Sequence, residues 1–223
     1  MDNDEFTAFY FKLLTETLVP YGYEPKQLID AIWSGTVAMV QNDGQLSNEK
    51  VFWKRFSSIF GDRVFNDKDI FEEFYKTTFN KAKDCCGFNP NAKIAIHALK
   101  AKGYKVILAT NPLFPAIATE NRIRWAGLEP NAFELYTTYE NSSYCKPNPK
   151  YYEEILSKIG LSAKDCLMVG NDVKEDMEAA KIVGMKVFLL TDCLINKERK
   201  DISIYPRGSF EQLISYIDKI KDN

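Results

Sequence analysis

The sequence has a single histidine, no excess of either charge and no long apolar run. Its 223 residues carry 29 basic and 31 acidic side chains, for a net charge of −2, and no Lys/Arg block is dense enough to bind nucleic acid or anionic lipid. No apolar stretch approaches the roughly 18 residues of a membrane span, and the start MDNDEF is acidic where a secretory signal would be basic. We therefore expect a cytoplasmic protein whose partner is a small molecule.

The cysteines and the single histidine do not indicate a metal site or a catalytic site. The five cysteines form no CxxC pair and no zinc-binding spacing, so buried free thiols are expected. His97 lies in the helical pattern NAKIAIHALKAKG, which favours a packed or surface imidazole over a catalytic one. A histidine-based triad is hard to build from this chain.

The first part of the chain has helical periodicity. Apolar residues recur at helical spacing over 6–18 and 29–40, and further helices are expected over 48–60, capped by Ser47, and over 67–83. The breaks between helices are expected at YGYEP, 21–25, and at FG, 60–61. These features predict a small helical bundle.

After CCGFNPN the pattern changes to short apolar runs that alternate with helical segments. The runs are YKVILA at 104–109, FELYTT at 133–138, CLMVG at 166–170 and KVFLL at 186–190. Alternation of this kind predicts an α/β fold, a parallel sheet with helices on both faces. Ligands of such sheets gather beyond the carboxyl ends of the strands.

Two of the loops at those ends offer groups that suit an anion. In ATNP the Thr110 hydroxyl and the backbone around Asn111 suit a phosphate near a helix start, although both residue types also cap helices. Lys146 precedes two prolines, which stiffen its loop and would deliver its charge to a fixed point. A surface lysine in a turn is the alternative.

The third loop, VGNDVKEDM, is acidic. Asn171 and Asp172 follow a predicted strand, and Asp176 lies four residues beyond Asp172. On a helix this spacing brings both carboxylates to one side, where Mg²⁺ would relieve their repulsion; acidic residues also favour the first turn of any helix. Together the three loops supply the hydrogen bonds, the cation and the metal site that phosphoryl transfer requires.

Three segments of the chain resemble, in order, the second, third and fourth motifs of the haloacid dehalogenase superfamily. They are ATN, a lysine before proline, and GNDxxxDMxAAKxxGM. The resemblance implies a Rossmann-like core over 87–223 and a helical cap over 1–86. It also implies that Thr110 and Asn111 bind the phosphoryl group, that Lys146 binds it too and is catalytic, and that Mg²⁺ is the cofactor. The expected metal ligands are Asn171, Asp172 and Asp176; because Asn171 replaces the family's common aspartate, either Asn171 or Asp172 contacts the metal.

The family's first motif is a strand ending in Asp-x-Asp-Gly-Thr, which supplies the nucleophile and the general acid/base. It is not found: DND at 2–4 has neither the strand nor the Gly-Thr, and Asp2 and Asp4 suit the N-cap region of a helix. We expect a truncated N-terminus, a missing first core strand, and little or no activity. Since that strand lies between those bearing the second and fourth motifs, its unfilled slot would invite self-association.

Three hypotheses follow. The leading one is a magnesium-dependent phosphatase of a small phosphorylated metabolite, which in the complete family enzyme acts through an aspartyl phosphate. The alternative is a non-catalytic phosphate- or metal-binding protein, and the third is a carbon–halogen or phosphonate hydrolase. The substrate stays open, because WSGT at 33–36 and the aromatics Phe52, Trp53 and Phe56 suit a bundle core as well as a ligand site.

Overall fold

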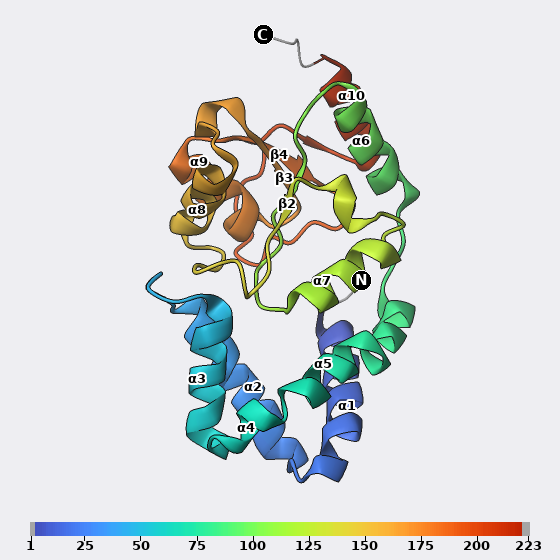
Figure 1. Ribbon diagram of the computed structural model, residues 1–223. Coiled ribbons are helices and arrows are strands. Elements are labelled where there is room, and N and C mark those ends of the chain that lie inside the picture. Colours follow the sequence, from blue (N-terminus) through green and yellow to red (C-terminus); the bar gives the residue numbers. More distant parts are fainter. Residues whose placement is uncertain (1–2, 220–223) are drawn as a thin grey trace. The chain divides into compact units, whose positions relative to one another are not determined.

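In the computed structural model the described residues are 3–219 (Figure 1). The chain forms two compact units. The first runs from the N-terminal residues through Phe88 and takes in Thr110–Pro130 and Thr137–Cys145; the second comprises Asn89–Ala109, Asn131–Tyr136 and the chain from Lys146 onward. The cap over 1–86 and the core over 87–223 remain a prediction, and the segments Thr110–Pro130 and Thr137–Cys145 of that core belong to the first unit.

The first unit is helical, as the periodicity predicts. Its helices are α1 (Asn3–Leu18), η1 (Val19–Tyr21), α2 (Pro25–Val40), α3 (Asn48–Phe60), α4 (Arg63–Asn66), α5 (Lys68–Lys76), η2 (Thr78–Cys85) and α7 (Ala116–Trp125). Ser47 caps α3, where its side chain accepts from the Lys50 N–H at 3.4 Å. Asp4 lies inside α1 rather than before it, and Asp2 lies outside the described residues.

The prediction of a single helix over 67–83 is wrong. The α-helix α5 ends at Lys76 and the tighter 3₁₀ segment η2 follows. The Thr77 hydroxyl donates back to the Glu73 carbonyl at 2.7 Å, a local hydrogen bond of the kind that competes with regular helix. The apolar spacing runs through this point, so it did not reveal the break.

Aromatic rings fill the core of the first unit. Phe56, Phe74 and Phe79 are fully buried, and Tyr10 contacts both Phe74 and Phe79 edge-on. Edge-to-face pairs add about 0.5–1.5 kcal/mol each beyond the burial of their area. Of the aromatics whose role the sequence left open, Phe56 is therefore a core residue.

The second unit confirms the α/β fold with parallel strands. β1 (Ile107–Leu108) pairs with β2 (Leu135–Tyr136), and β4 (Lys186–Leu190) lies between β3 (Leu167–Gly170) and β5 (Arg207–Gly208). The strands thus form two parallel sheets, of two and three strands, instead of one continuous sheet. The absent first strand itself remains a prediction.

Helices flank the larger sheet on both sides (Figure 1). Within this unit α6 (Pro90–Ala101) and α10 (Phe210–Lys219) lie on one side of β3 and β4, and α8 (Pro149–Ile159) and α9 (Ala179–Val183) on the other. Ala95, Phe188 and Leu213 form a buried cluster between α6, β4 and α10.

The remaining elements are short. They are η3 (Pro130–Ala132), η4 (Ala163–Asp165) and the π-helical η5 (Val173–Glu178), which follows the end of β3. None of the helices within 3–219 is long and apolar enough to cross a lipid bilayer.

Candidate functional site

A buried ion pair joins two of the residues that the sequence singles out. The Lys146 ammonium lies 2.6 Å from Asp176 Oδ1, and both side chains are only 7% exposed. The ammonium also lies 5.7 Å and 5.9 Å from the ring centroids of Tyr151 and Tyr152 on α8. Lys146 is therefore not a surface lysine in a turn, because an anion and two rings fix its charge inside the second unit.

Asp176 also holds the loop after β3. Its Oδ2 accepts from the backbone N–H groups of Asn171 and Asp172, both at 3.0 Å. A Cβ at position 170 would collide with the Asp176 carboxylate, so this close approach requires Gly170. The carboxylate thus ties the end of β3 to η5 and to Lys146 at once.

In each of the side chains of Asn171 and Asp172, one of the two polar atoms makes hydrogen bonds within the protein. Asp172 Oδ1 caps η5, accepting from the N–H groups of Lys174 and Glu175 at 2.9 Å each, and Asn171 Nδ2 donates to the Cys193 carbonyl at 2.6 Å. No described residue donates a hydrogen bond to Asp172 Oδ2 or Asn171 Oδ1. These two oxygens are the atoms of the loop that remain for a ligand.

The loop fits Mg²⁺ in part. Mg²⁺ usually binds one or two carboxylates and keeps several waters, which Asp172 Oδ2 and Asn171 Oδ1 match. Asp176 fits less well, because Lys146 and two backbone N–H groups occupy its oxygens and already relieve the repulsion from Asp172. No cluster of three or more His, Cys, Asp or Glu side chains within 3–219 could hold a metal. The predicted ligand set of Asn171, Asp172 and Asp176 stays a prediction.

Thr110 and Asn111 lie in the first unit, just after β1. The Thr110 carbonyl accepts from the Thr137 hydroxyl at 2.6 Å, which joins two loops that follow strands. Helix α7 begins only at Ala116, whose N–H donates to the Glu140 carboxylate at 2.9 Å and 3.0 Å. The alternative that Thr110 and Asn111 cap this helix is therefore wrong, because Pro115 is the residue that precedes its first turn.

The structure thus groups some of the predicted site residues and not others. Lys146, Asn171, Asp172 and Asp176 form one cluster in the second unit, whereas Thr110 and Asn111 belong to the first. A common phosphate site for Thr110 and Lys146 stays a prediction.

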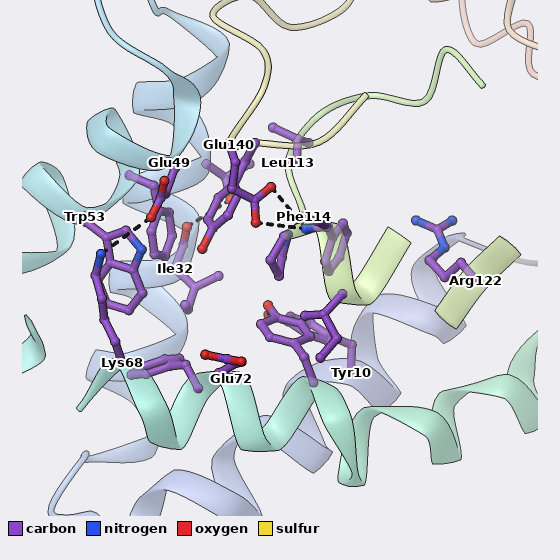
Figure 2. Close-up of a pocket in the computed structure, with 18 of the residues that line it drawn as sticks. Tyr10, Ile32, Glu49, Trp53, Lys68, Glu72, Leu113, Phe114, Arg122 and Glu140 are labelled. Atoms are coloured by element: carbon purple, nitrogen blue, oxygen red, sulfur yellow. Dashed lines mark hydrogen bonds and ion pairs between the residues drawn. The ribbon is translucent and has the colours of Figure 1, made fainter. Parts of the chain in front are cut away.

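The first unit contains a cavity that the sequence did not indicate as such. It has a volume of about 750 Å³ and lies between α1, α2, α3, α5 and α7 and the loops at 113–115 and 139–140 (Figure 2). Phe52 and Trp53 line it, so they are candidates for ligand contacts, whereas Phe56 is not among the lining residues. Glu49 and Lys68 form an ion pair of 3.5 Å on its wall. The sequence offered two signals for this cavity: the aromatic pattern of α3, and WSGT at 33–36, of which Trp33 and Thr36 line it.

Comparisons with known proteins identify the family of the chain. A family model described as haloacid dehalogenase-like hydrolase matches residues 23–184. A glyceraldehyde 3-phosphate phosphatase of Methanothermobacter thermautotrophicus is 28% identical over 133 residues, 60% of this chain and 57% of the relative. A phosphoglycolate phosphatase of Vibrio cholerae is 32% identical over 126 residues, 56% of this chain and 52% of the relative. The matches thus span somewhat more than half the length of these relatives.

Solved structures share the fold. The 2-haloacid dehalogenase of Pseudomonas syringae aligns with a TM-score of 0.57 at 18% identity, covering 95% of this chain and 89% of that one. The HAD-hydrolase YfnB of Bacillus subtilis, in a structure bound to magnesium, aligns with a TM-score of 0.55 at 17% identity, covering 98% of this chain and 93% of that one. Because the family model matches most of the sequence, the chain belongs to the haloacid dehalogenase-like hydrolases.

Proposed function

We propose that this protein is a phosphohydrolase that acts on phosphate monoesters of small metabolites. Thr110 and Asn111 would bind the phosphoryl oxygens, and Lys146 would neutralise the charge that builds up on them. The family membership and the two relatives named as phosphatases support this proposal. A chemistry of this kind depends mainly on positioning and on electrostatic stabilisation, because the protein itself makes few covalent bonds.

The observation that carries the proposal is the buried pair of Lys146 and Asp176. A lysine held 2.6 Å from a buried carboxylate loses little side-chain entropy when it binds an anion. Asp176 acts here as a positioning residue for Lys146 and for the Asn171–Asp172 backbone. Bound at Asp172 Oδ2 and Asn171 Oδ1, Mg²⁺ would neutralise charge on the phosphoryl group. An amide oxygen in place of a carboxylate would make that binding weaker.

The nucleophile of the family reaction is not found in the sequence. The family reaction forms an aspartyl phosphate, and the 223 residues contain no Asp-x-Asp-Gly-Thr. We therefore propose that this polypeptide binds phosphate and Mg²⁺ but turns over little substrate. The same absence favours the second candidate, a non-catalytic phosphate-binding protein.

One assay separates these candidates. Hydrolysis of 4-methylumbelliferyl phosphate with Mg²⁺ is measured for the 223-residue polypeptide and for the same polypeptide preceded by a β-strand that ends in Asp-x-Asp-Gly-Thr. The phosphatase proposal expects a rate near background in the first case and a gain of at least about a hundredfold, lost in Lys146→Met, in the second. No gain, with phosphate binding intact, would favour the binding protein. A high rate of the 223-residue polypeptide that Asp4→Asn abolishes would overturn the assignment of the nucleophile.

A further inference from the structure

The first unit buries most of its polar side chains at one place. Of the six buried polar side chains among its described residues, five lie around the start of α3 and in the loop at 137–145, and the sixth is on α7. The five are Asn42, Asn48, Thr137, Thr138 and Ser142. Polar groups are costly to bury unless they are hydrogen-bonded, and a fully bonded network holds the chain in one arrangement. This network therefore fixes the segments that it joins.

Asn48 is the centre of the network. The residue is fully buried in the first turn of α3. Its Nδ2 donates to the Pro112 carbonyl and to Cys145 Sγ, both at 3.3 Å, and its Oδ1 accepts from Asn42 Nδ2 at 2.9 Å. Both ends of the amide thus have partners, and each partner lies on a different segment of the first unit.

The backbone at the start of α3 holds the loop at 137–145. The first N–H groups of a helix have no partner inside it. Here the Asn48 N–H donates to the Ser142 carbonyl and the Glu49 N–H to the Tyr139 carbonyl, both at 2.8 Å. The Tyr139 N–H in turn donates to the Phe114 carbonyl at 3.0 Å. The start of α3, the loop at 137–145 and the loop at 110–115 are therefore joined in one hydrogen-bonded assembly.

The loop at 110–115 carries the residues proposed to bind the phosphoryl group. The Thr110 carbonyl accepts from the buried Thr137 hydroxyl at 2.6 Å, and the buried Pro112 carbonyl accepts from Asn48. The backbone is thus held immediately before and immediately after Asn111. Binding groups need to stay within about 0.5 Å of their productive positions, and the two bonds meet this requirement from inside the protein.

We propose that Asn48 is a positioning residue for phosphate binding. It holds the backbone at Pro112 so that the Thr110 hydroxyl and Asn111 keep the position that an oxyanion requires. The phosphate in this inference rests on the proposed function, whereas the support of the loop rests on the contacts of the first unit alone. An amide suits this position because it donates two hydrogen bonds and accepts a third, and an aliphatic side chain would leave the Pro112 carbonyl without this donor.

The test compares two alanine variants of the 223-residue protein. Asn48→Ala removes the support of the loop. Asn42→Ala is the matched control, because Asn42 is a buried amide of the same network that bonds to the Leu46 carbonyl at 2.9 Å, to the Gly44 N–H at 3.2 Å and to Asn48. No described hydrogen bond of its side chain reaches the loop at 110–115. Calorimetry measures the binding of inorganic phosphate at a temperature where both variants are folded, and mass spectrometry measures hydrogen exchange of the backbone.

The two variants should differ in binding more than in stability. We expect Asn48→Ala to weaken phosphate binding about tenfold and Asn42→Ala at most about twofold, because displacement of a binding group by about 1 Å is costly even in a folded protein. Hydrogen exchange in Asn48→Ala should become faster at 111–116 and 139–145 and keep the wild-type rate in β3 and η5.

Asn48→Asp gives a second readout that a loss of packing would not change. The carboxyl has the shape of the amide, and it can donate to the Pro112 carbonyl only when it is protonated. Burial raises the pKa of such a carboxyl, so its phosphate affinity relative to the wild type should recover as the pH falls from about 8 to about 5.5. The ratio to the wild type removes the ionisation of phosphate and of the Cys145 thiol, the titratable side chain in contact with Asn48.

Four results would overturn the inference. They are unchanged binding in Asn48→Ala, equal weakening by Asn42→Ala, faster exchange throughout the protein instead of in the two loops, and a deficit of Asn48→Asp that does not change with pH. The proposed function fails separately, if the wild type does not bind phosphate or if Thr110→Val does not weaken it. Exchange at 111–116 in Asn48→Ala would then decide whether Asn48 holds the loop.

Discussion

The Lys146–Asp176 pair allows a quantitative prediction about stability. Two unit charges at 2.6 Å attract by about 6 kcal/mol at an effective dielectric constant of about 20. Desolvation of both groups offsets much of this, so the net value of the pair is small, but removal of one partner leaves the other charge buried and costs about 3–5 kcal/mol. That loss is a large part of the ~5–15 kcal/mol that stabilises a typical domain.

The two single variants should differ in a defined direction. Lys146→Met keeps the length of the side chain, and the Asp176 carboxylate retains the backbone N–H groups of Asn171 and Asp172. Asp176→Asn removes the negative charge beside the buried ammonium, and the rings of Tyr151 and Tyr152 near it do not replace that charge. We therefore expect Asp176→Asn to be the more destabilising change. The double variant should lose much less than the sum of the two.

Urea unfolding followed by circular dichroism measures all four members of this double-mutant cycle. A coupling energy of at least about 1 kcal/mol is expected, because neighbouring groups in one network do not behave additively. Additive losses, within about 0.5 kcal/mol, would mean that the two charges do not stabilise each other. The ion pair would then not be a fixed feature of the site.

Three further predictions concern other positions. Gly170→Ala should lower the free energy of unfolding by about 1–3 kcal/mol, because the added Cβ collides with the Asp176 carboxylate; unchanged urea stability would contradict this. Asn48→Ala should lower it by roughly 1–3 kcal/mol, since Asn48 is buried and bonds to Asn42 at 2.9 Å and to the Pro112 carbonyl at 3.3 Å; calorimetric melting at an unchanged temperature would argue against that network. Burial raises the pKa of Tyr10 from 10.0 to about 12, so its contribution to stability is complete below pH 10 and is lost as the pH rises through 12. Tyr10→Phe should therefore flatten the decline of urea stability between these pH values, and an equally steep decline in the variant would rule out Tyr10 as its cause.

The local signals in the sequence predicted much of the fold. Apolar spacing located α1, α2, α3 and α5, Ser47 marked the start of α3, and the apolar runs contained β1 to β4. The error over 67–83 arose where one residue overrides the spacing. Thr77 ends α5 through a local hydrogen bond.

The sequence predicted which residues belong to the site, but not which of them contact one another. The motifs identified Lys146 and Asp176, yet nothing local shows that two side chains 30 positions apart form a buried ion pair. Glu140 caps α7 from 24 residues away, and no sequence signal indicated it. The cavity beside Trp53 depends on how several helices pack, which periodicity alone does not determine.

The central claim is that Thr110 and Lys146 hold the same phosphoryl group. A crystal structure of the protein with tungstate and Mn²⁺, both located by their anomalous scattering, tests it most directly. The account predicts one tungstate within hydrogen-bond distance of the Thr110 hydroxyl and the Lys146 ammonium, with Mn²⁺ on Asp172 or Asn171. A tungstate bound away from either residue, or Thr110 and Lys146 turned toward different parts of the protein, would contradict it.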